Sequence, residues 1–497
     1  MYQDSGIRQG SFCFLTGHQC KSLQILYGKD LITPDDSLYA NFTSAFWSSQ
    51  QADREPRCIL KAPTATSVSV AVLLSRLTQC PFAVKSGGHA AFEDASNIED
   101  GITISLEHLD DISLSSRADK VAIGAGNKWH RVYSYLADYD VAVIGGRAAS
   151  IGVGGLTTGG GISFFSNLYG WACDNVASYD VVLASGKQVT ASPTSHKDLY
   201  WALRGGGNNF GIVVSFNLYT VPLPRNEMWS SMRTYASSSF SLVAQAFHNA
   251  IVNSPTDPNA GLWVAWLRNN GTSIASTTLW YARPNGNNST VFQDFNAIPS
   301  IADTTRNTTL TNLTTEVDSS NPNGFRETYY CLTVQADREL AQLAKDIFYE
   351  ELPATDAIQG ALPVLLYQGI TSGQIAAMAK RGGNPLGLDS SGGPLFLMHI
   401  SCWWELQSDD DAVYAFASRV LQRIKDEASK RGKGSEYLYM NYASKFEDVI
   451  ASYGEGNKER LKGVASRYDP GGVFQTLQPG YFKLDRPPVR DERFFSG

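Results

Sequence analysis

The chain has little basic charge and no long hydrophobic run. Its 497 residues include 41 Lys or Arg against 48 Asp or Glu, which gives a formal net charge of −7 at pH 7. Proteins that bind nucleic acid usually carry a basic domain, so this charge argues against that class. The longest apolar stretch, around Val68–Leu77, is far shorter than the roughly 20 residues that a membrane span requires. We therefore expect neither a nucleic-acid partner nor a membrane span.

Cysteine is also scarce, and its spacing excludes the common cysteine motifs. The seven cysteines are spread out and none forms a CxxC pair, which argues against a zinc or dithiol site, so we expect no metal. The first residues, MYQDSGIRQGSFCFLTG, lack the basic-then-apolar pattern of a signal peptide. Six Asn-x-Ser/Thr glycosylation sites nevertheless occur, at Asn41, Asn270, Asn287, Asn288, Asn307 and Asn312. We interpret the chain as a secreted or secretory-pathway glycoprotein whose signal peptide is absent from this sequence. A cytoplasmic protein with chance sites is the alternative.

From about 58 to 222, short β-rich runs alternate with glycine turns. Strands are predicted for the segments CILKAP (58–63), PFAVKSGG (81–88), GITISL (101–106) and VAIGAG (121–126). Apolar spacing and Thr or Ser caps predict helices over 64–80 and 127–139. The segment 177–191 reads as a hairpin, and 199–221 as a short helix, a glycine turn and a long strand.

From about 226 to 435, glycine is less frequent. The alternating segments MWSSMRTY, GLWVAWLR and STTLWYA and the apolar run PLFLMHISCWWEL (394–406) predict an antiparallel sheet. A long helix is predicted over 409–430. This pattern is typical of an α+β domain in which helices cover one face of the sheet.

Three glycine groups stand within the first half: SGGH at 86–89, GGRAASIGVGGLTTGGGIS at 145–163 and RGGGNNFG at 204–211. Clustered glycines can turn successive N–H groups towards an anion such as phosphate. Arg204 beside the third group adds a positive charge, so we expect a large phosphorylated ligand. A Rossmann site is the alternative, but no acidic residue follows GAGNKW at the required distance. The GxxxxGK[ST] signature of P-loop nucleotidases is absent.

Five motifs in order resemble the berberine-bridge-enzyme-like (BBE-like) branch of the vanillyl-alcohol-oxidase/p-cresol-methylhydroxylase (PCMH) flavoproteins. They are KSGGH (85–89), GAGNKW (124–129), IGVGGLTTGGGIS (151–163), WALRGGGNNFGIV (201–213), and YMNYAS (439–444) together with RYDPGGVFQ (467–475). The resemblance covers roughly 55–222 and 436–478. It implies a two-part PCMH-type FAD-binding domain at 1–225, with a core at about 55–222. A substrate-binding domain would follow at 226–435, and a C-terminal segment, 436–497, would return to the FAD domain.

The resemblance also implies how FAD is held. His89 matches the histidine that bonds covalently to the flavin 8α-methyl carbon; the alternative is a histidine that only hydrogen-bonds the pyrophosphate. Ala148 stands where many relatives have a second, cysteinyl link, so a single covalent link is expected. Ile151 matches a position where valine accompanies oxidases and leucine dehydrogenases. The implied cofactor-binding residues are Lys85, Ser86, Gly87, Gly88, His89, Gly146, Ile151, Gly152, Gly154, Gly155, Gly160, Gly161, Asn175, Gly207, Gly211, Ile212, Val213 and Asn441.

Removing a hydride from a substrate leaves a proton for a base of suitable pKa. The resemblance implies Tyr439 or Tyr442 for that role, with Asn441 facing the flavin, although both tyrosines could be core aromatics. A tyrosine with a free pKa of about 10 needs a nearby positive charge or hydrogen bonds to act as a base. His399 is a further candidate, six residues before Glu405 and on the same face of one strand; a buried structural histidine is the alternative.

Three more residues receive structural interpretations. The resemblance implies a disulfide between Cys20 and Cys80. Cys173 is expected to pack as a small apolar residue, and His130 to be structural.

Together these features predict an FAD-dependent oxidase. It would take a hydride from an alcohol, an amine or an activated C–H bond of a small secondary metabolite and reduce O₂ to H₂O₂. The missing second anchor at Ala148 argues against a carbohydrate or oligosaccharide oxidase, which stays an alternative. Two others are a flavoprotein cyclase that couples oxidation to ring closure and an inactive flavin- or ligand-binding protein.

Overall fold

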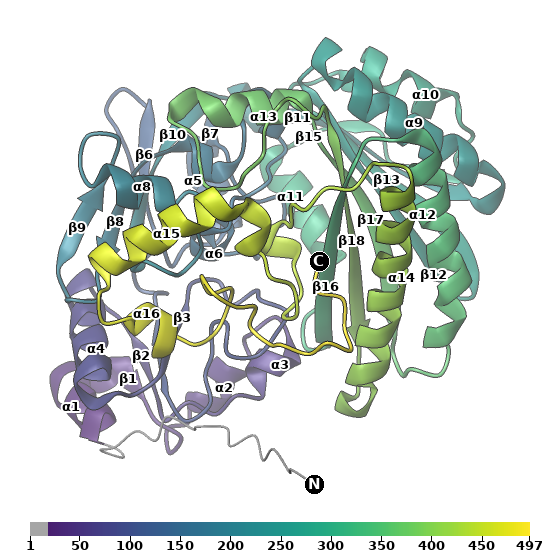
Figure 1. The fold of residues 1–497 in the computed structure, drawn as a ribbon. Coiled ribbons are helices and arrows are strands. Elements are labelled where there is room, and N and C mark those ends of the chain that lie inside the picture. Colours follow the sequence, from purple (N-terminus) through teal and green to yellow (C-terminus); the bar gives the residue numbers. More distant parts are fainter. Residues whose placement is uncertain (1–17) are drawn as a thin grey trace, which may run out of the picture.

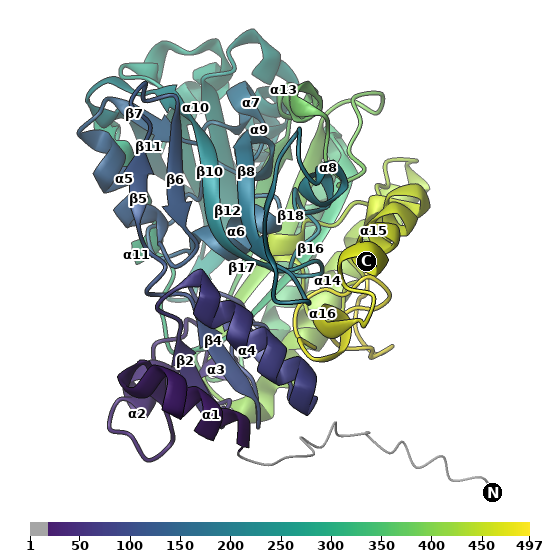
Figure 2. The same cartoon turned by 90° about the vertical axis from the view of Figure 1, so that its left-hand side faces the viewer.

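Three β-sheets organise residues 18–497, the part of the chain that the computed structural model describes (Figures 1 and 2). Cys13 and the N-terminal segment examined for a signal pattern lie outside the described residues. The mixture of helices with mainly antiparallel sheets confirms the predicted α+β class. No helix within 18–497 is long and apolar enough to cross a membrane. The same residues contain no group of three or more His, Cys, Asp or Glu that could hold a metal ion.

The first sheet has four strands in the order β1-β2-β4-β3, of which β2, β4 and β3 run parallel. Its strands are β1 (Leu31–Ile32), β2 (Cys58–Lys61), β3 (Phe82–Lys85) and β4 (Ile102–Ser105). The helices before and beside it are α1 (His18–Tyr27), α2 (Tyr39–Thr43), α3 (Ser49–Ala52) and α4 (Ala65–Thr78). The predicted helix at 64–80 is therefore present, and Thr64 caps it by accepting a hydrogen bond from the Ser67 N–H.

The disulfide predicted between Cys20 and Cys80 is wrong. Cys20 on α1 is bonded to Cys58 at the start of β2, with the two Cα atoms 6.0 Å apart. Cys80 instead accepts a hydrogen bond from Gln19 Nε2 at 3.1 Å. Helix α1 thus places Cys20 over β2, and the pairing could not be read from the positions of the cysteines.

The second sheet has six antiparallel strands in the order β5-β6-β10-β8-β9, with β7 also paired to β10. Its strands are β5 (Ile112–Leu114), β6 (Lys120–Gly124), β7 (Val141–Val143), β8 (Val176–Val182), β9 (Gln188–Ala191) and β10 (Ile212–Pro222). The connecting helices are α5 (Trp129–Ala137), α6 (Val153–Thr158), α7 (Ser166–Tyr169) and α8 (Lys197–Ala202). The predicted hairpin at 177–191 corresponds to β8 and β9.

The third sheet has eight antiparallel strands in the order β14-β11-β13-β12-β17-β18-β16, with β15 paired to β11. Its strands are β11 (Glu227–Ala236), β12 (Ala260–Asn269), β13 (Thr272–Tyr281), β14 (Ala302–Asp303), β15 (Arg306–Thr309), β16 (Arg326–Gln335), β17 (Leu362–Ile370) and β18 (Leu395–Trp404). Helices α9 (Phe240–Asn253), α12 (Arg338–Glu351) and α14 (Asp410–Lys430) share a core with one face of this sheet. The shorter helices of this part are α10 (Gln293–Ala297), α11 (Leu310–Ser319) and α13 (Ser372–Met378).

After α14 the chain returns to its first half (Figure 1). Helices α15 (Glu455–Tyr468) and α16 (Val473–Thr476) belong to this segment. The Phe82 N–H donates to the Leu477 carbonyl at 2.7 Å, and the Tyr453 hydroxyl donates to the Gly205 carbonyl at 2.9 Å. The segment therefore ties both glycine-rich sheets together, while the division at 225 and 435 stays a prediction.

Candidate active site

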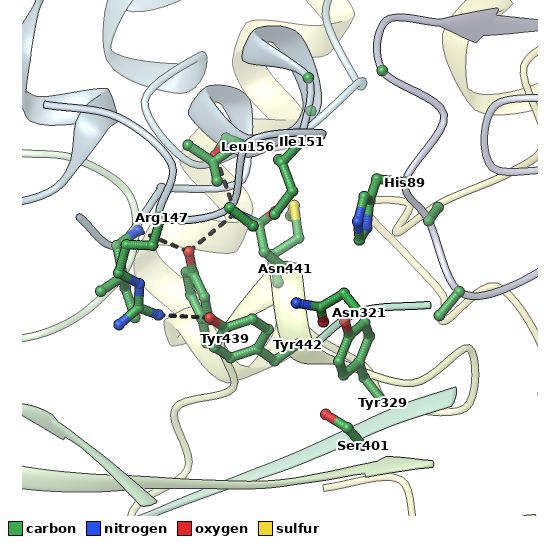
Figure 3. Close-up of a pocket in the computed structure, with 18 of the residues that line it drawn as sticks. His89, Arg147, Ile151, Leu156, Asn321, Tyr329, Ser401, Tyr439, Asn441 and Tyr442 are labelled. Atoms are coloured by element: carbon green, nitrogen blue, oxygen red, sulfur yellow. Dashed lines mark hydrogen bonds between the residues drawn. The ribbon is translucent and has the colours of Figure 1, made fainter. Parts of the chain in front are cut away.

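A cavity of about 750 Å³ lies between the glycine loops of the first half and the eight-stranded sheet (Figure 3). Alternate residues of β12, β17 and β18 form its floor, as the two-residue period of a strand requires; they include Trp263, Gln368 and His399. Opposite them lie the turn after β3 and the loop before α6. Residues 439–443 of the returning segment complete the wall.

The two glycine loops touch backbone to backbone. A Cβ atom added to Gly87 would lie 2.4 Å from the Gly152 nitrogen, so only glycine allows this approach. Ser86 joins the loops further, because its hydroxyl donates to the Ala125 carbonyl at 2.6 Å and accepts from the Gly154 N–H at 3.1 Å. The wall is thus a rigid backbone surface with small side chains, suited to a large ligand that lies close against it.

His89 is held at the cavity wall by stacking. Its ring lies on Trp47 with centroids 4.1 Å apart, and Trp47 in turn stacks on Tyr329 at 5.6 Å. Burial lowers the pKa of His89 to about 4, so the imidazole is neutral at pH 7. Its Nε2 is buried without a hydrogen-bond partner in the described part of the chain. The imidazole is therefore fixed and neutral, and its unpartnered Nε2 leaves it open to a further bound group.

Tyr439 is enclosed by hydrogen-bond donors. Its hydroxyl oxygen accepts from the N–H groups of Gly161 at 3.2 Å and Ile162 at 3.0 Å, and from Asn441 Nδ2 at 3.1 Å. Asn441 also donates to the Leu156 carbonyl at 3.0 Å (Figure 3). Burial raises the pKa of Tyr439 far above its usual value. Tyr439 and Asn441 therefore tie the returning segment to the glycine run beside α6.

Tyr442 faces a different partner. Arg147 Nη2 donates to the Tyr442 hydroxyl at 2.7 Å (Figure 3). The same nitrogen donates to Gln368 Oε1 at 2.6 Å. His399 stacks on the Tyr442 ring with centroids 4.2 Å apart. Burial, with a smaller effect of Arg147, lowers the pKa of His399 to about 3, so this ring is also neutral at pH 7. The guanidinium thus places a positive charge at the phenol oxygen of Tyr442.

Sequence reasoning missed Arg147. It is the only charged residue in the glycine-rich run 145–163. The signal available in the sequence was a single charged residue among small ones. Small neighbours cannot cover the Arg147 side chain, so it stays open to a ligand.

Most of the predicted cofactor-binding residues line the cavity, and five do not. Those outside the lining are Lys85, Gly146, Gly160, Gly161 and Asn175. Lys85 points away because Val84 and Ser86 face the cavity; its Nζ lies 4.8 Å from the Phe42 ring, and burial lowers its pKa to about 8. Asn175 Nδ2 donates to the Tyr169 and Trp171 carbonyls. Lys85 and Asn175 are thus buried outside the cavity and do not line it.

Two side chains expected near a ligand lie elsewhere. Arg204 is buried, pairs with Asp174 at 3.3 Å and donates to the Cys173 carbonyl, so it does not line the cavity. Glu405 follows β18 and accepts a hydrogen bond from Gln359, away from His399. Cys173 is fully buried, as expected, and His130 is exposed on α5.

Comparisons with known proteins place this architecture. An FAD-binding-domain family matches residues 56–192. A relative named FAD-dependent monooxygenase tpcD, from Cochliobolus heterostrophus, is 36% identical over 459 residues, covering 90% of this chain and 88% of the relative. The chain belongs to the PCMH/BBE-like family of FAD-linked oxidoreductases. This flavoenzyme is also 29% identical to the bifunctional solanapyrone synthase of Alternaria solani, with 94% of the chain and 88% of the relative covered.

The fold of this flavoenzyme matches solved members of the family. A berberine bridge enzyme variant in complex with (S)-reticuline superposes with a TM-score of 0.76 at 17% identity, covering 95% of this chain and 99% of that one. The predicted family and the assignment as an FAD-linked oxidoreductase are therefore confirmed.

Proposed function

We propose that this flavoenzyme is an oxidase that removes a hydride from an alcohol, an amine or an activated C–H bond of a small secondary metabolite. Bound FAD supplies the two-electron acceptor, and O₂ then receives the electrons and is released as H₂O₂. The observation that carries the proposal is one cavity in which the orphaned His89 ring and the Tyr442–Arg147 pair both line the wall.

The cofactor would lie along the glycine loops. The residues that line the cavity along these loops and would hold it are Ser86, Gly87, Gly88, Ile151, Gly152, Gly154, Gly155, Gly207, Gly211, Ile212 and Val213. His89 would carry the covalent bond, since its ring is fixed and neutral. Ala148 also lines the cavity but offers only a methyl group, so a second, cysteinyl link has no sulfur to form from.

Tyr442 would accept the proton that the substrate releases. The Arg147 guanidinium, 2.7 Å from the phenol oxygen, stabilises negative charge there. The hydroxyl of Tyr439 is instead occupied by three N–H donors. His399 stays neutral and would position the Tyr442 ring by stacking. The bond that breaks is the substrate C–H, whose electron pair would leave as a hydride to the two-electron acceptor that bound FAD supplies. Tyr442 would take the O–H or N–H proton as its phenolate, the form that the Arg147 charge favours.

The substrate would be apolar rather than a sugar. The floor of the cavity carries Leu362, Val364 and Leu366 beside Trp263 and Trp403, whereas a sugar would require a polar group for most of its hydroxyls. Relatives named as a monooxygenase and as a bifunctional synthase support two other outcomes, an oxygen insertion and an oxidation coupled to a second step such as the predicted ring closure. A carbohydrate oxidase and an inactive binding protein are weaker, since neither explains the apolar floor together with the Tyr442–Arg147 pair.

The first test is acid precipitation of the purified protein. We expect the flavin in the pellet and an intact mass raised by one FAD. The variant His89→Ala should release its flavin into the supernatant, while His130→Ala, which changes an exposed histidine, should behave as wild type. Flavin in the wild-type supernatant would contradict the proposed covalent bond but not the assignment as an oxidoreductase. Incubation of candidate metabolites under ¹⁸O₂ then separates the activities, since an oxidase yields H₂O₂ and a monooxygenase labels its product.

We also propose that the protein passes through the secretory pathway. The asparagines of all six glycosylation sites are exposed, and the Cys20–Cys58 disulfide is typical of an oxidising compartment. Enzymatic removal of N-glycans from protein made in a eukaryotic secretory host should shift its electrophoretic mobility. An unchanged mobility would contradict the glycoprotein assignment.

A further inference from the structure

Arg147 is the only permanently charged side chain among the described residues that line the cavity. No Asp, Glu or Lys of this part of the chain belongs to the lining. The two lining histidines are neutral at pH 7, because burial lowers the pKa of His89 to about 4 and that of His399 to about 3. The cavity therefore carries one net positive charge.

This charge lacks the carboxylate that neutralises the other buried arginines. Arg204 pairs with Asp174 at 3.3 Å, Arg233 with Asp303 at 3.1 Å and Arg326 with Asp410 at 2.5 Å. Within residues 18–497, no carboxylate lies within 4.0 Å of Arg147, although its side chain is buried with only 8% exposed. A buried charge without a partner is costly, so its retention calls for an anion that the chain itself does not supply.

The guanidinium also keeps donors free. Both of its hydrogen bonds, to Tyr442 and Gln368, use Nη2. Neither Nε nor Nη1 has a protein acceptor among the described residues, and neither is closed off from solvent. Its carbon Cζ lies 4.9 Å from the Trp263 ring centroid, which holds the plane of the fork in place. A fixed fork with unused N–H groups suits an oxygen anion.

We propose that Arg147 binds an anionic oxygen of the substrate, so that the substrate class is an apolar molecule with one carboxylate or one acidic enol or phenol group. This inference rests on the proposed function and specifies its substrate. Gln368, which belongs to β17 of the sheet floor, holds Arg147 on that side of the cavity. His89 lies across the cavity from Arg147 (Figure 3).

The test uses the purified holoenzyme and two probes of one shape, benzoate and benzamide, titrated by calorimetry. We expect wild type to bind benzoate about 10- to 100-fold more tightly than benzamide, as a charge-assisted hydrogen bond predicts. Arg147→Gln should lose this preference and keep its affinity for benzamide. Arg147→Lys, which keeps the charge but not the fork, should retain part of it and serves if Arg147→Gln does not fold. Arg131→Gln, at an exposed arginine of α5, is the matched control.

Two results would overturn the inference. One is wild type that binds benzoate no better than benzamide, or binds neither; the other is a preference that survives in Arg147→Gln. Failure of the proposed function would be seen in a different measurement, the flavin content. Flavin content and acid extraction are measured on the same samples, so a protein without FAD refutes the oxidase whatever the benzoate titration gives.

Discussion

The two tyrosines of the YMNY motif should respond differently to the same loss of a hydroxyl. Tyr442→Phe removes the group beside Arg147 and leaves the ring, which still stacks on His399. Loss of a positioned general base slows the chemical step by about 10²- to 10⁴-fold. We expect this decrease in the rate of flavin reduction, with little change in the free energy of unfolding.

Tyr439→Phe is the matched comparison. It leaves the N–H groups of Gly161 and Ile162 buried without an acceptor, and each such group costs about 1–3 kcal/mol. Since Asn441 Nδ2 retains its bond to Leu156, the loss should fall mainly on the two backbone groups. We expect a free energy of unfolding lower by about 2–6 kcal/mol and a smaller effect on the reductive step.

Anaerobic rapid mixing with an active substrate, followed by the bleaching of the flavin absorbance, gives the first quantity. Chemical denaturation gives the second. The reasoning would be refuted if Tyr442→Phe reduced its flavin at the wild-type rate, or if Tyr439→Phe lost the reductive step while its unfolding midpoint stayed unchanged.

Two further predictions concern oxygen and pH. Ile151→Val should speed flavin reoxidation by O₂ in rapid mixing and Ile151→Leu should slow it, because Ile151 lines the cavity; equal rates in both would contradict a role in oxygen access. Burial raises the pKa of Glu327 from 4.5 to about 11, so it is protonated when folded and ionises on unfolding at neutral pH. Relative to Glu327→Gln, the free energy of unfolding of wild type should therefore fall as pH rises from 4.5 towards about 11, by up to about 1.4 kcal/mol per pH unit. Denaturation at about pH 5 and pH 8 tests this, and a difference that does not change with pH would contradict it.

The glycine groups and the strand alternation were predictable because both report directly on the backbone. A turn that brings Gly87 against Gly152 can contain only glycine, so it leaves a clear mark in the sequence. The alternation along β11, β12 and β13 likewise marked two faces. Lys85 could not be excluded from the sequence, since only the structure shows that its neighbours Val84 and Ser86 face the cavity.

Pairings between distant side chains were not predictable. Arg204 stands in a glycine run as a phosphate ligand would, yet it is neutralised by Asp174, thirty positions earlier in the chain. Cys20 could have paired with several partners, and only the placement of α1 over β2 decides for Cys58. Local pattern fixes which residues turn and alternate, whereas partners depend on how separate segments come together.

The cavity draws its wall from both ends of the chain, from the turn at Gly87 and from Tyr442 in the returning segment. During synthesis the glycine turn leaves the ribosome more than three hundred residues before Tyr442 does. The nascent chain therefore has no complete cavity until translation is nearly finished, and the covalent attachment that we propose at His89 would follow folding. A chain released early would keep every glycine motif and still be unable to acquire its cofactor.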